Sequence, residues 1–303
     1  MNTPGAEWQG YALSIGASIL FGLIPWYLQL LLPLSGNLLF GHRLLTQLVC
    51  AFLIVLLTRQ LPALNACLRS PRQLGILLLT SPLVGVQWWV FFWAPVNGFT
   101  VDMAIGYFLL PLTMALTGML VFGEQLRALQ WLALLVAVAG VGVELGSVGT
   151  FSWITLLVCL GYPPYFILRR RLPLETRVNF AAESLLLLPV GLILVVMAAN
   201  AGEQLVPDRD YGLALLLGAG ALGTIAMLMF VAASTRLSFT VFGLLGYLEP
   251  VLLMTVALLV LRETISAEQA VSYTMFAAAI MLVFIDGYLR WKSKAMVRKY
   301  FTP

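Results

Sequence analysis

The sequence predicts an all-α membrane protein in which ten transmembrane helices form two inverted repeats of five helices each. Three observations predict this fold: the composition, the number of apolar runs and an internal repeat. Of the 303 residues, 61% are hydrophobic and 10% are charged, whereas soluble domains carry about 25% charged residues. The composition therefore places the chain in a membrane.

Ten apolar runs are long enough to cross a bilayer, whose hydrocarbon core requires about 20 helical residues. The connections between the runs are too short to contain a soluble domain. In chain order, we expect spans at residues 10–31, 37–58, 73–94, 100–122, 127–145, 151–168, 178–199, 211–232, 238–261 and 267–289. The first run follows no basic segment or cleavage-like pattern, so we expect it to be retained as a span.

The basic residues predict the orientation of these spans. With a cytoplasmic N-terminus, all of the 17 Lys and Arg residues fall in cytoplasmic segments except Arg43, Arg209 and Arg262. Basic residues concentrate in cytoplasmic loops. We therefore expect both termini in the cytoplasm, and we interpret the basic pI as an orientation signal rather than as nucleic-acid binding.

The two halves of the chain share one gap-free register. The segments GYFLLPLTMALTGMLVFGE, at 106–124, and GYLEPVLLMTVALLVLRE, at 246–263, each place Pro thirteen residues before Glu, and Pro250 follows Pro111 by 139 residues. The same offset relates Gly22 to Gly161 and Glu124 to Glu263. Because each repeat holds an odd number of spans, the second repeat enters the membrane inverted relative to the first.

The repeat predicts the domain organisation and the position of a binding site. We expect the first repeat at 1–148, the second at 149–290 and a basic cytoplasmic tail at 291–303. Inverted repeats place substrates near the middle of the membrane, beside interrupted helices. The expected interruptions, in spans 1, 4, 6 and 9, are at Pro25, Pro111, Pro164 and Pro250.

Two sequence motifs resemble a known family. The residues GHR at 41–43 and WAPVNGFTVDMAIGYFLLPL at 93–112 are similar to motifs of the RarD branch of the EamA family, within the drug/metabolite transporter superfamily. The resemblance covers essentially the whole chain and implies two five-span halves that transport a small molecule. Asp102 stands where the branch usually has Glu, and Leu110 stands where it has Asn. These departures bear on substrate identity, which fold analogy does not determine.

Glu249 is a strong candidate for a functional residue. It lies about eleven residues into the ninth span, and so about 16 Å deep at 1.5 Å per residue. Its repeat mate is Leu110, so the fold alone does not require a charge here. Ionisable groups inside a membrane are functional candidates by default, and the alternative is a buried carboxylate bonded to a neighbouring helix.

His42 and Arg43 are expected about 8 Å below the periplasmic end of the second span. Arg43 either extends to the lipid head groups or faces a cavity, where its guanidinium can hold a carboxylate by two hydrogen bonds. His42 is the only histidine in the chain. Because histidine titrates near neutral pH, it either carries a coupling proton or packs between helices.

Asp102 and a set of aromatic and amide residues complete the candidate site. Asp102 follows the turn signal Asn97-Gly98 and either caps the helix of the fourth span or offers a carboxylate to an ammonium group or a proton. The other candidates either line an amphipathic cavity or pack between helices; they are Gln87, Trp89, Trp93, Asn97, Tyr107, Tyr165 and Tyr247.

Three further glutamates are expected to have structural roles. Glu183, at the cytoplasmic start of the seventh span, is expected to pair with Arg177 at the level of the head groups. Glu124 and Glu263 are repeat mates with Arg127 and Arg262 close by in the sequence, and this symmetry favours a scaffold role for both.

These features predict an inner-membrane secondary transporter that exports a small amphoteric metabolite. An amino-acid-like compound or a metallophore fits the mixture of charges, and alternating access with proton antiport is the expected mechanism. The alternatives are efflux or permeation of a chloramphenicol-type drug, flipping of a lipid-linked intermediate, and uptake in place of export.

Missing motifs argue against several classes of function, including an intramembrane enzyme, the rival to a transporter. The sequence contains no GxxxxGK[ST] loop of the kind that binds ATP. It also contains no HExxH or GxGD motif that would indicate an enzyme. Cys50, Cys67 and Cys159 lack CxxC spacing, so we expect no disulfide, metal site or cofactor. The expected partners are a small-molecule substrate, a coupled H⁺ and membrane lipid, without nucleic acid. The sequence leaves the oligomeric state open.

Overall fold

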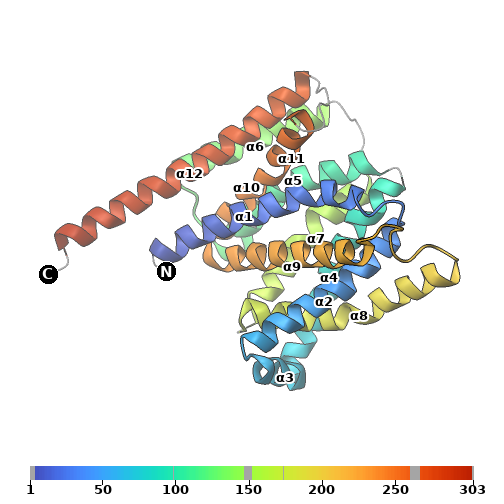
Figure 1. The fold of residues 1–303 in the computed structure, drawn as a ribbon. Helices are drawn as coiled ribbons and strands as arrows, with labels where there is room; N and C mark the ends of the chain where they lie inside the picture. Colours follow the sequence, from blue (N-terminus) through green and yellow to red (C-terminus); the bar gives the residue numbers. More distant parts are fainter. Residues whose placement is uncertain (1–3, 98, 147–151, 173, 260–266, 302–303) are drawn as a thin grey trace.

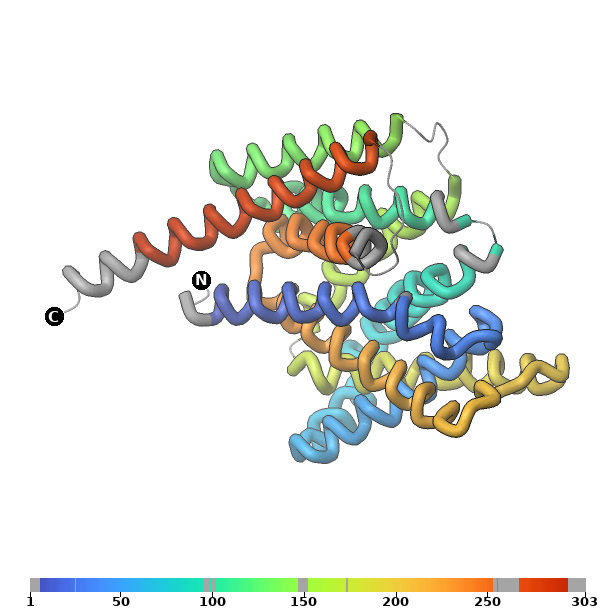
Figure 2. The backbone as a smooth tube through the Cα atoms, turned by 45° about the horizontal axis from the view of Figure 1, so that its top comes forward, coloured from blue at the N-terminus to red at the C-terminus, as the bar shows by residue number. Residues whose placement is uncertain are grey.

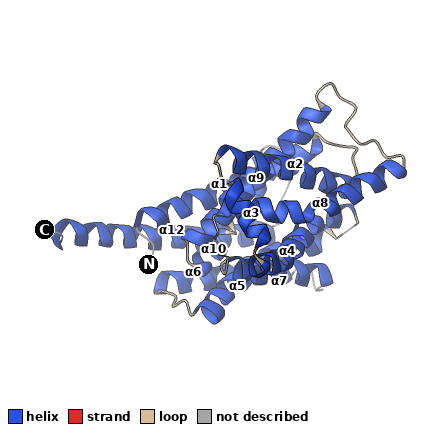
Figure 3. Cartoon of the chain, turned by 90° about the horizontal axis from the view of Figure 1, so that it is seen from below, coloured by secondary structure: helices blue, strands red, loops and turns tan. Residues whose placement is uncertain are grey.

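The chain folds into a bundle of helices (Figure 1). The computed structural model describes residues 4–97, 99–146, 152–172, 174–259 and 267–301. All regular secondary structure in these residues is helical, and the two chain ends lie at the same end of the bundle (Figure 1, Figure 3). The predicted boundary between the repeats, at residues 148 and 149, lies outside the described residues.

Twelve helices occur in the described part of the chain. They are α1 (Pro4–Gln29), α2 (Gly36–Leu57), α3 (Leu61–Arg69), α4 (Pro71–Val96), α5 (Thr100–Phe122), α6 (Ala128–Gly146), α7 (Trp153–Arg169), α8 (Thr176–Asn200), α9 (Gly212–Arg236), α10 (Phe239–Leu245), α11 (Leu248–Leu259) and α12 (Ala267–Phe301). Among the described residues, 8 helices are long and apolar enough to cross a membrane, and two apolar segments, Trp153–Arg169 and Phe239–Leu252, are shorter. The predicted all-α membrane class is confirmed.

The short helix α3 was not predicted. It occupies the connection between the second and third predicted spans and packs on α8 and α4. Leu64 and Cys67 are buried, whereas Asn65 and Arg69 on the opposite face are exposed. This segment has nine residues, which is too short to be recognised as a span. It is amphipathic because only one of its faces is buried.

The ninth predicted span, 238–261, is divided into α10 and α11. At the break, Gly246 N–H donates to the Gly243 carbonyl (2.8 Å) and Tyr247 N–H donates to the Leu244 carbonyl (3.3 Å), so the last turn tightens to i→i+3 bonds. Pro250 lies in the first turn of α11, where its missing N–H removes no helical bond. The predicted interruption near Pro250 is confirmed.

The other three predicted interruptions are wrong. α5 and α7 continue through Pro111 and Pro164, and α1 continues past Pro25 to Gln29. A proline inside a helix removes one backbone hydrogen bond, and other contacts can hold the helix together. Beside Pro111, the Thr113 hydroxyl donates to the carbonyl of Cys159 in α7 (2.5 Å) and so ties α5 to its neighbour.

The helices pack against one another in matched pairs. α2 packs on α8, α5 on α10 and α6 on α12, and the last pair lies side by side in Figure 1 and Figure 2. Two further pairs of contacts correspond to each other. The contact of α1 with α9 corresponds to that of α4 with α7, and the contact of α5 with α7 corresponds to that of α11 with α1. In the predicted repeat, the first three contacts would join a helix to its own repeat mate, and the remaining four would form two pairs of equivalent contacts.

Glu124 fixes the start of α10. Its carboxylate accepts hydrogen bonds from the backbone N–H groups of the first two α10 residues, at 2.5 and 2.8 Å. The partial positive charge of a helix N-terminus favours such a carboxylate. The structural role predicted for Glu124 is therefore present, but Arg127 pairs with Asp286. Arg262 and Glu263 lie outside the described residues.

A close crossing of α10 and α5 at Gly243 leads to a first prediction. A methyl group on Gly243 would lie 2.6 Å from the Met114 Cβ and 3.0 Å from the Pro111 carbonyl oxygen. These atoms move only with the backbone, so we expect Gly243→Ala to lower the free energy of unfolding by about 2 kcal/mol. Thermal unfolding of the purified protein in detergent measures this effect.

Gly142, in α6, provides the matched control for this substitution. No atom lies within 4 Å of a methyl group at Gly142, and alanine is the better helix former. Gly142→Ala is therefore expected to be neutral or to stabilise the protein by less than about 1 kcal/mol. Equal unfolding temperatures for the two variants would contradict the close crossing.

Candidate substrate cavity

A cavity of about 430 Å³ lies between helices of both halves of the chain. α1, α2, α4 and α5 line it from the first half, and α7, α9, α10, α11 and α12 line it from the second. The wall is mainly aromatic and apolar; its rings are Phe21, Trp88, Phe91, Tyr107, Phe108, Tyr162, Phe166, Phe230, Phe242 and Tyr273. Cavities of this size bind small organic molecules.

Arg43 brings a positive charge to this cavity. The Ser35 hydroxyl caps α2 by accepting the Leu38 N–H (3.3 Å), which places Arg43 in the second turn. Its side chain is buried, and the guanidinium carbon lies 5.1 Å from the ring centre of Trp88 and 5.7 Å from that of Phe92. The Nε atom has no hydrogen-bond partner. The aromatic faces stabilise the cation and leave this donor for a ligand.

Glu249 brings a negative charge to the same cavity. The break before α11 places it in the first turn of a new helix, where unsatisfied N–H groups favour a carboxylate. This explains why a glutamate stands beside a proline within an apolar run. Neither Arg43 nor Glu249 takes part in an ion pair among the described residues.

Two tyrosines accompany these charges. Tyr107 from α5 and Tyr162 from α7 both line the cavity. Each phenol is near enough to both charged groups to interact with them electrostatically. A ligand held in this cavity is therefore offered a cation, an anion and two phenol groups within an apolar wall.

The predicted residues Trp89 and Trp93 lie outside the residues that line the cavity. Their ring centres are 5.0 Å apart, and Trp93 stacks on Phe99 at 5.7 Å and packs on Trp153 at 6.2 Å. The Trp89 indole N–H donates to the Asn37 side-chain oxygen (3.2 Å). These rings form an aromatic cluster that joins α4 to the start of α7.

Asn97 and Asp102 flank the connection from α4 to α5. Asn97 is exposed, and its side-chain amide donates to the Trp93 carbonyl (2.9 Å), which closes the end of α4. Asp102 lies in the first turn of α5, and its backbone carbonyl accepts the Thr155 hydroxyl (2.8 Å). Gly98, the other residue of the predicted turn, lies outside the described residues.

His42 and Gln87 each bond to a distant backbone carbonyl. The His42 Nε2 atom lies 2.7 Å from the Leu205 carbonyl oxygen, which ties α2 to the connection between α8 and α9. The Gln87 amide donates to the Leu157 carbonyl (2.7 Å) and so ties α4 to α7. The structure brings neither side chain into the central cavity.

Tyr165 belongs to a buried polar network rather than to the cavity wall. Its hydroxyl accepts a hydrogen bond from Arg169 (2.8 Å) and donates to Glu183 (3.2 Å). Arg169 also forms an ion pair with Glu183, which accepts the Thr80 hydroxyl at 2.9 Å. All four residues are buried, so the network joins α4, α7 and α8 away from solvent.

The predicted pairing of Glu183 with Arg177 is therefore wrong. Arg177 pairs with Glu175 at 2.8 Å on an exposed surface, and hydrogen bonds from Gln60 and Arg177 lower the pKa of Glu175. The six-residue separation of Arg177 and Glu183 places them on different faces of one helix. Arg169 reaches Glu183 from the neighbouring helix instead.

Tyr247 lies at the break between α10 and α11 with its ring away from the cavity. It is buried, its hydroxyl donates to the Phe108 carbonyl (3.0 Å), and its ring stacks on Phe276 at 4.5 Å. Of the eleven candidate residues, the cavity is lined by Arg43, Tyr107 and Glu249.

Trp88 and Tyr162 are two of the cavity residues that the sequence prediction did not select for the site. Trp88 and Phe91 are three apart and so share a helical face, which the spacing shows as readily as for Trp89 and Trp93. Tyr162 directly precedes the Pro163-Pro164 pair. Helical spacing and proximity to that pair were the available signals, but neither tells which face of a helix is turned inward.

A cluster of four phenylalanines includes three that line the cavity. It consists of Phe166, Phe230, Phe239 and Phe242. The ring centres of Phe230 and Phe242 are 4.6 Å apart, those of Phe166 and Phe242 are 5.2 Å apart, and those of Phe166 and Phe239 are 6.2 Å apart. We call this group the phenylalanine cluster.

Comparison with known proteins identifies the family. No protein-family model matches the chain. The chain is 38% identical to the chloramphenicol-sensitive protein RarD of Pseudomonas aeruginosa over 96% of each chain. This chain belongs to the RarD family. It is also 34% identical to an uncharacterized transporter of Pasteurella multocida, over 94% of this chain and 99% of that one, and 28% identical to protein RarD of Escherichia coli, over 92% and 95%.

The RarD family assignment agrees with the motifs at 41–43 and 93–112. With the apolar helices, it identifies the chain as a multi-pass membrane protein of a transporter family. A solved crystal structure shares the fold, with a TM-score of 0.69 and 17% sequence identity over 94% of this chain and 98% of that one.

Proposed function

We propose that this RarD-family protein is an inner-membrane secondary transporter of ten transmembrane helices, with both termini in the cytoplasm. It exports a small amphoteric organic metabolite, such as an amino-acid-like compound or a metallophore. Two inverted repeats of five spans, as in the EamA family of the drug/metabolite transporter superfamily, alternate access to the central cavity, and an exchanged proton drives export.

Two observations support the inverted repeat. The matched packing of helix pairs, such as α1 on α9 and α4 on α7, is the pattern that a two-fold relation between the halves produces. The Tyr247 hydroxyl also bonds to the carbonyl of Phe108, and these residues are 139 positions apart, which is the repeat offset. A residue that contacts its own repeat mate lies near the axis relating the halves.

The unpaired charges of Arg43 and Glu249 carry the functional proposal. A charge within apolar surroundings is costly unless it is paired, yet these two face one cavity and neither has an ion-pair partner among the described residues. A zwitterionic substrate supplies both missing partners. Its carboxylate binds the Arg43 guanidinium, its ammonium group binds Glu249, and the aromatic wall holds its apolar part.

The same geometry supports proton antiport. Intramembrane carboxylates commonly form part of proton pathways in transporters. When the cavity opens to the periplasm, a proton that binds Glu249 displaces the ammonium group of the substrate. When the cavity opens to the cytoplasm, the proton leaves and the carboxylate binds the next substrate.

The remaining candidates are proposed to act on the helices that line the cavity. They are His42, Gln87, Trp89, Trp93, Asn97, Asp102, Tyr165 and Tyr247. All but Asn97, which bonds back to Trp93 of its own helix, contact a neighbouring segment, as the Gln87 bond to α7 illustrates. Their effect on transport is expected to be indirect.

Efflux of a chloramphenicol-type drug is a second candidate function. The predominantly aromatic wall of the cavity favours it, as does the name of the Pseudomonas aeruginosa relative. A neutral aromatic drug would use the wall while leaving Arg43 and Glu249 unpaired. We therefore prefer the zwitterionic substrate.

Metabolite profiling of cells and medium, with and without the protein, tests the function. Compounds retained in cells without the protein are then assayed for uptake into inside-out vesicles under an imposed proton gradient. Gradient-dependent accumulation of a zwitterion supports the proposal, and accumulation of chloramphenicol alone supports the drug alternative. A change only in a lipid-linked intermediate, or a new covalent product, would contradict both.

A further inference from the structure

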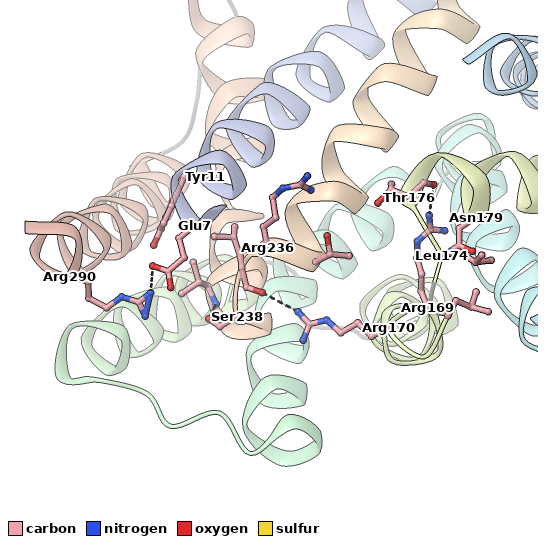
Figure 4. A pocket seen from close by; sticks show the side chains of 14 residues that line it. Glu7, Tyr11, Arg169, Arg170, Leu174, Thr176, Asn179, Arg236, Ser238 and Arg290 are labelled. Carbon is pink, nitrogen blue, oxygen red and sulfur yellow. Dashed lines mark hydrogen bonds and ion pairs between the residues drawn. The ribbon is translucent and has the colours of Figure 1, made fainter. Parts of the chain in front are cut away.

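A second cavity, of about 520 Å³, lies at the end of the bundle that holds both chain termini (Figure 1, Figure 4). Glu7 and Tyr11 near the start of α1 line it, together with the ends of α7 and α9, the starts of α8 and α10, and Arg290 of α12. We call this cavity the terminal recess. It is lined by several of the helices that line the central cavity, so the positions of the two spaces can be compared along each helix.

The terminal recess and the central cavity are stacked end to end. Along α1, Tyr11 lines the recess and Ser18, about two turns later, lines the central cavity. Along α7, Arg169 lines the recess and Phe166, about one turn earlier, lines the central cavity. α9 and α10 show the same order. A solute that moved between the two spaces would therefore travel along these four helices.

The phenylalanine cluster lies between the two spaces. Phe166, Phe230 and Phe242 line the central cavity, and Phe239 belongs to the first turn of α10, beside residues that line the recess. Phe166, Phe239 and Phe242 are exposed by only 1%, 0% and 1%. Because these buried rings pack on one another, the cluster closes the central cavity toward the recess.

The central cavity extends in the opposite direction, away from the chain termini. Leu28, in the last turn of α1, lines it, and so does Met103, in the first turn of α5. α1 begins at the end of the bundle that holds the termini, so Leu28 lies toward the other end. The cavity is therefore closed at one end and reaches the helix ends at the other.

Arg170 directly follows α7 and joins it to the segment between α9 and α10. One of its guanidinium nitrogens donates to the Ser234 carbonyl at 2.7 Å and to the Leu237 carbonyl at 3.2 Å. Figure 4 shows the side chain extending from α7 toward Ser238. A charged donor strengthens a hydrogen bond, so these contacts fix the end of α7 against the segment that leads into α10.

The same guanidinium lies over two aromatic rings. Its carbon is 4.7 Å from the ring centre of Phe122, the last residue of α5, and 4.8 Å from that of Phe239, the first residue of α10. A cation within about 6 Å of a ring centre is attracted to the ring face. Glu124, whose carboxylate bonds to the start of α10, also interacts electrostatically with Arg170. Arg170 and Glu124 therefore join the ends of α5, α7, α9 and α10 beside the phenylalanine cluster.

We propose that the phenylalanine cluster is a gate between the central cavity and the terminal recess, and that Arg170 and Glu124 form the latch that holds it closed. The break at Gly246 separates α10 from α11, so releasing the latch lets α10 move as a unit away from α7. That movement opens a path between the two cavities. The role of the gate in export rests on the proposed function, in which the recess faces the cytoplasm; the closed cluster and its latch do not.

Cysteine labelling from each face of the membrane tests the gate without measuring transport. The parent is the full-length chain with alanine in place of Cys50, Cys67 and Cys159, and each reporter adds one cysteine to it. Ser18→Cys reports on the central cavity, and Thr235→Cys, at an exposed residue of the recess, reports on the recess. A small, membrane-impermeant thiosulfonate is applied to right-side-out and to inside-out membrane vesicles.

We expect Thr235→Cys to be labelled from the membrane face that carries the chain termini, and Ser18→Cys from the opposite face alone. Adding Arg170→Gln should raise the labelling rate of Ser18→Cys from the terminus face about tenfold. Losing hydrogen bonds from a charged group changes the ratio of closed to open gates by roughly this factor, and the rate follows the open fraction. Phe242→Ala, which removes a ring of the gate, should raise the same rate.

Arg171→Gln is the matched control for the latch. Arg171 is the next residue along the chain and is exposed, so its replacement should leave the labelling of both reporters unchanged. Arg170→Lys keeps the cation without the planar guanidinium and should give an intermediate rate, which provides a second variant if Arg170→Gln does not fold. Thermal unfolding in detergent shows which variants are folded.

Two results would overturn the gate. One is labelling of Ser18→Cys in the parent from the terminus face, or from neither face. The other is an equal labelling rate in folded Arg170 and Arg171 variants. Faster labelling confined to the Arg170 variants and Phe242→Ala supports the gate even if no zwitterion proves to be exported, so failure of the gate and failure of the proposed function are distinguishable.

Discussion

Replacing Glu249 with glutamine is expected to reduce proton-coupled export of a zwitterionic substrate about 100-fold. Glutamine keeps the shape and hydrogen-bonding capacity of the side chain but removes its charge and its exchangeable proton. A hydrogen bond to a charged group contributes about 1.5–3 kcal/mol, and the loss of coupling adds to this. Uptake into inside-out vesicles under an imposed proton gradient measures the effect, with protein abundance determined in the same membranes.

Arg43 provides the complementary half of this prediction. Arg43→Gln should abolish transport of a carboxylate substrate, and Arg43→Lys should retain part of it, because lysine keeps the charge but forms no bidentate contact. Glu203 is exposed in the connection after α8, so Glu203→Gln is the matched control and should transport normally. Unchanged transport in Arg43→Lys and Arg43→Gln would remove Arg43 from the site.

Breaking the buried Arg169–Glu183 ion pair is expected to have the largest effect on stability. Both side chains are almost fully buried, at 4% and 0% exposure. Glu183→Ala leaves the Arg169 charge without its carboxylate, and removing one partner of a buried pair costs about 3–5 kcal/mol. We expect a large fall in folded protein, measured by membrane abundance and by thermal unfolding in detergent.

The chain offers a matched control and a rescue for this substitution. Glu175 and Arg177 form an ion pair with both side chains exposed, at 58% and 42%, and an exposed pair contributes at most about 1 kcal/mol. Glu175→Ala should therefore be mild. Combining Glu183→Leu with Arg169→Met removes both charges and should recover part of the stability. A double variant no more stable than Glu183→Ala would show that the pair is not what stabilises this region.

The sequence predicts the helices well because the membrane constrains the backbone. Within lipid, every backbone N–H and carbonyl must be bonded inside the chain, so an apolar run of sufficient length forms a helix. The spans at 37–58 and 211–232, for example, correspond to α2 and α9. The short amphipathic α3 was missed because it need not cross the membrane, so this constraint does not mark it in the sequence.

Position along a helix can be predicted from sequence, whereas direction around the helix cannot. Counting residues along their predicted spans indicated that Arg43 and Glu249 lie away from the span ends, and both side chains line the central cavity. Trp88 and Trp89 are adjacent in sequence, yet Trp88 contacts Arg43 and lines the cavity while Trp89 joins an aromatic cluster. Successive residues point about 100° apart, so a small rotation of the helix decides which one faces the substrate.

By itself, the sequence determined the membrane class and the positions of most helices, and it contained the 139-residue offset and the two charges within apolar runs. Tertiary structure alone decided the partners of charged side chains: Glu183 pairs with Arg169 of the neighbouring helix, and Glu124 bonds to the backbone at the start of α10. It also brought Arg43 and Glu249, far apart in the chain, to one cavity. The physical reason is that hydropathy and residue counting act along one helix, whereas these contacts depend on how separate helices rotate and pack.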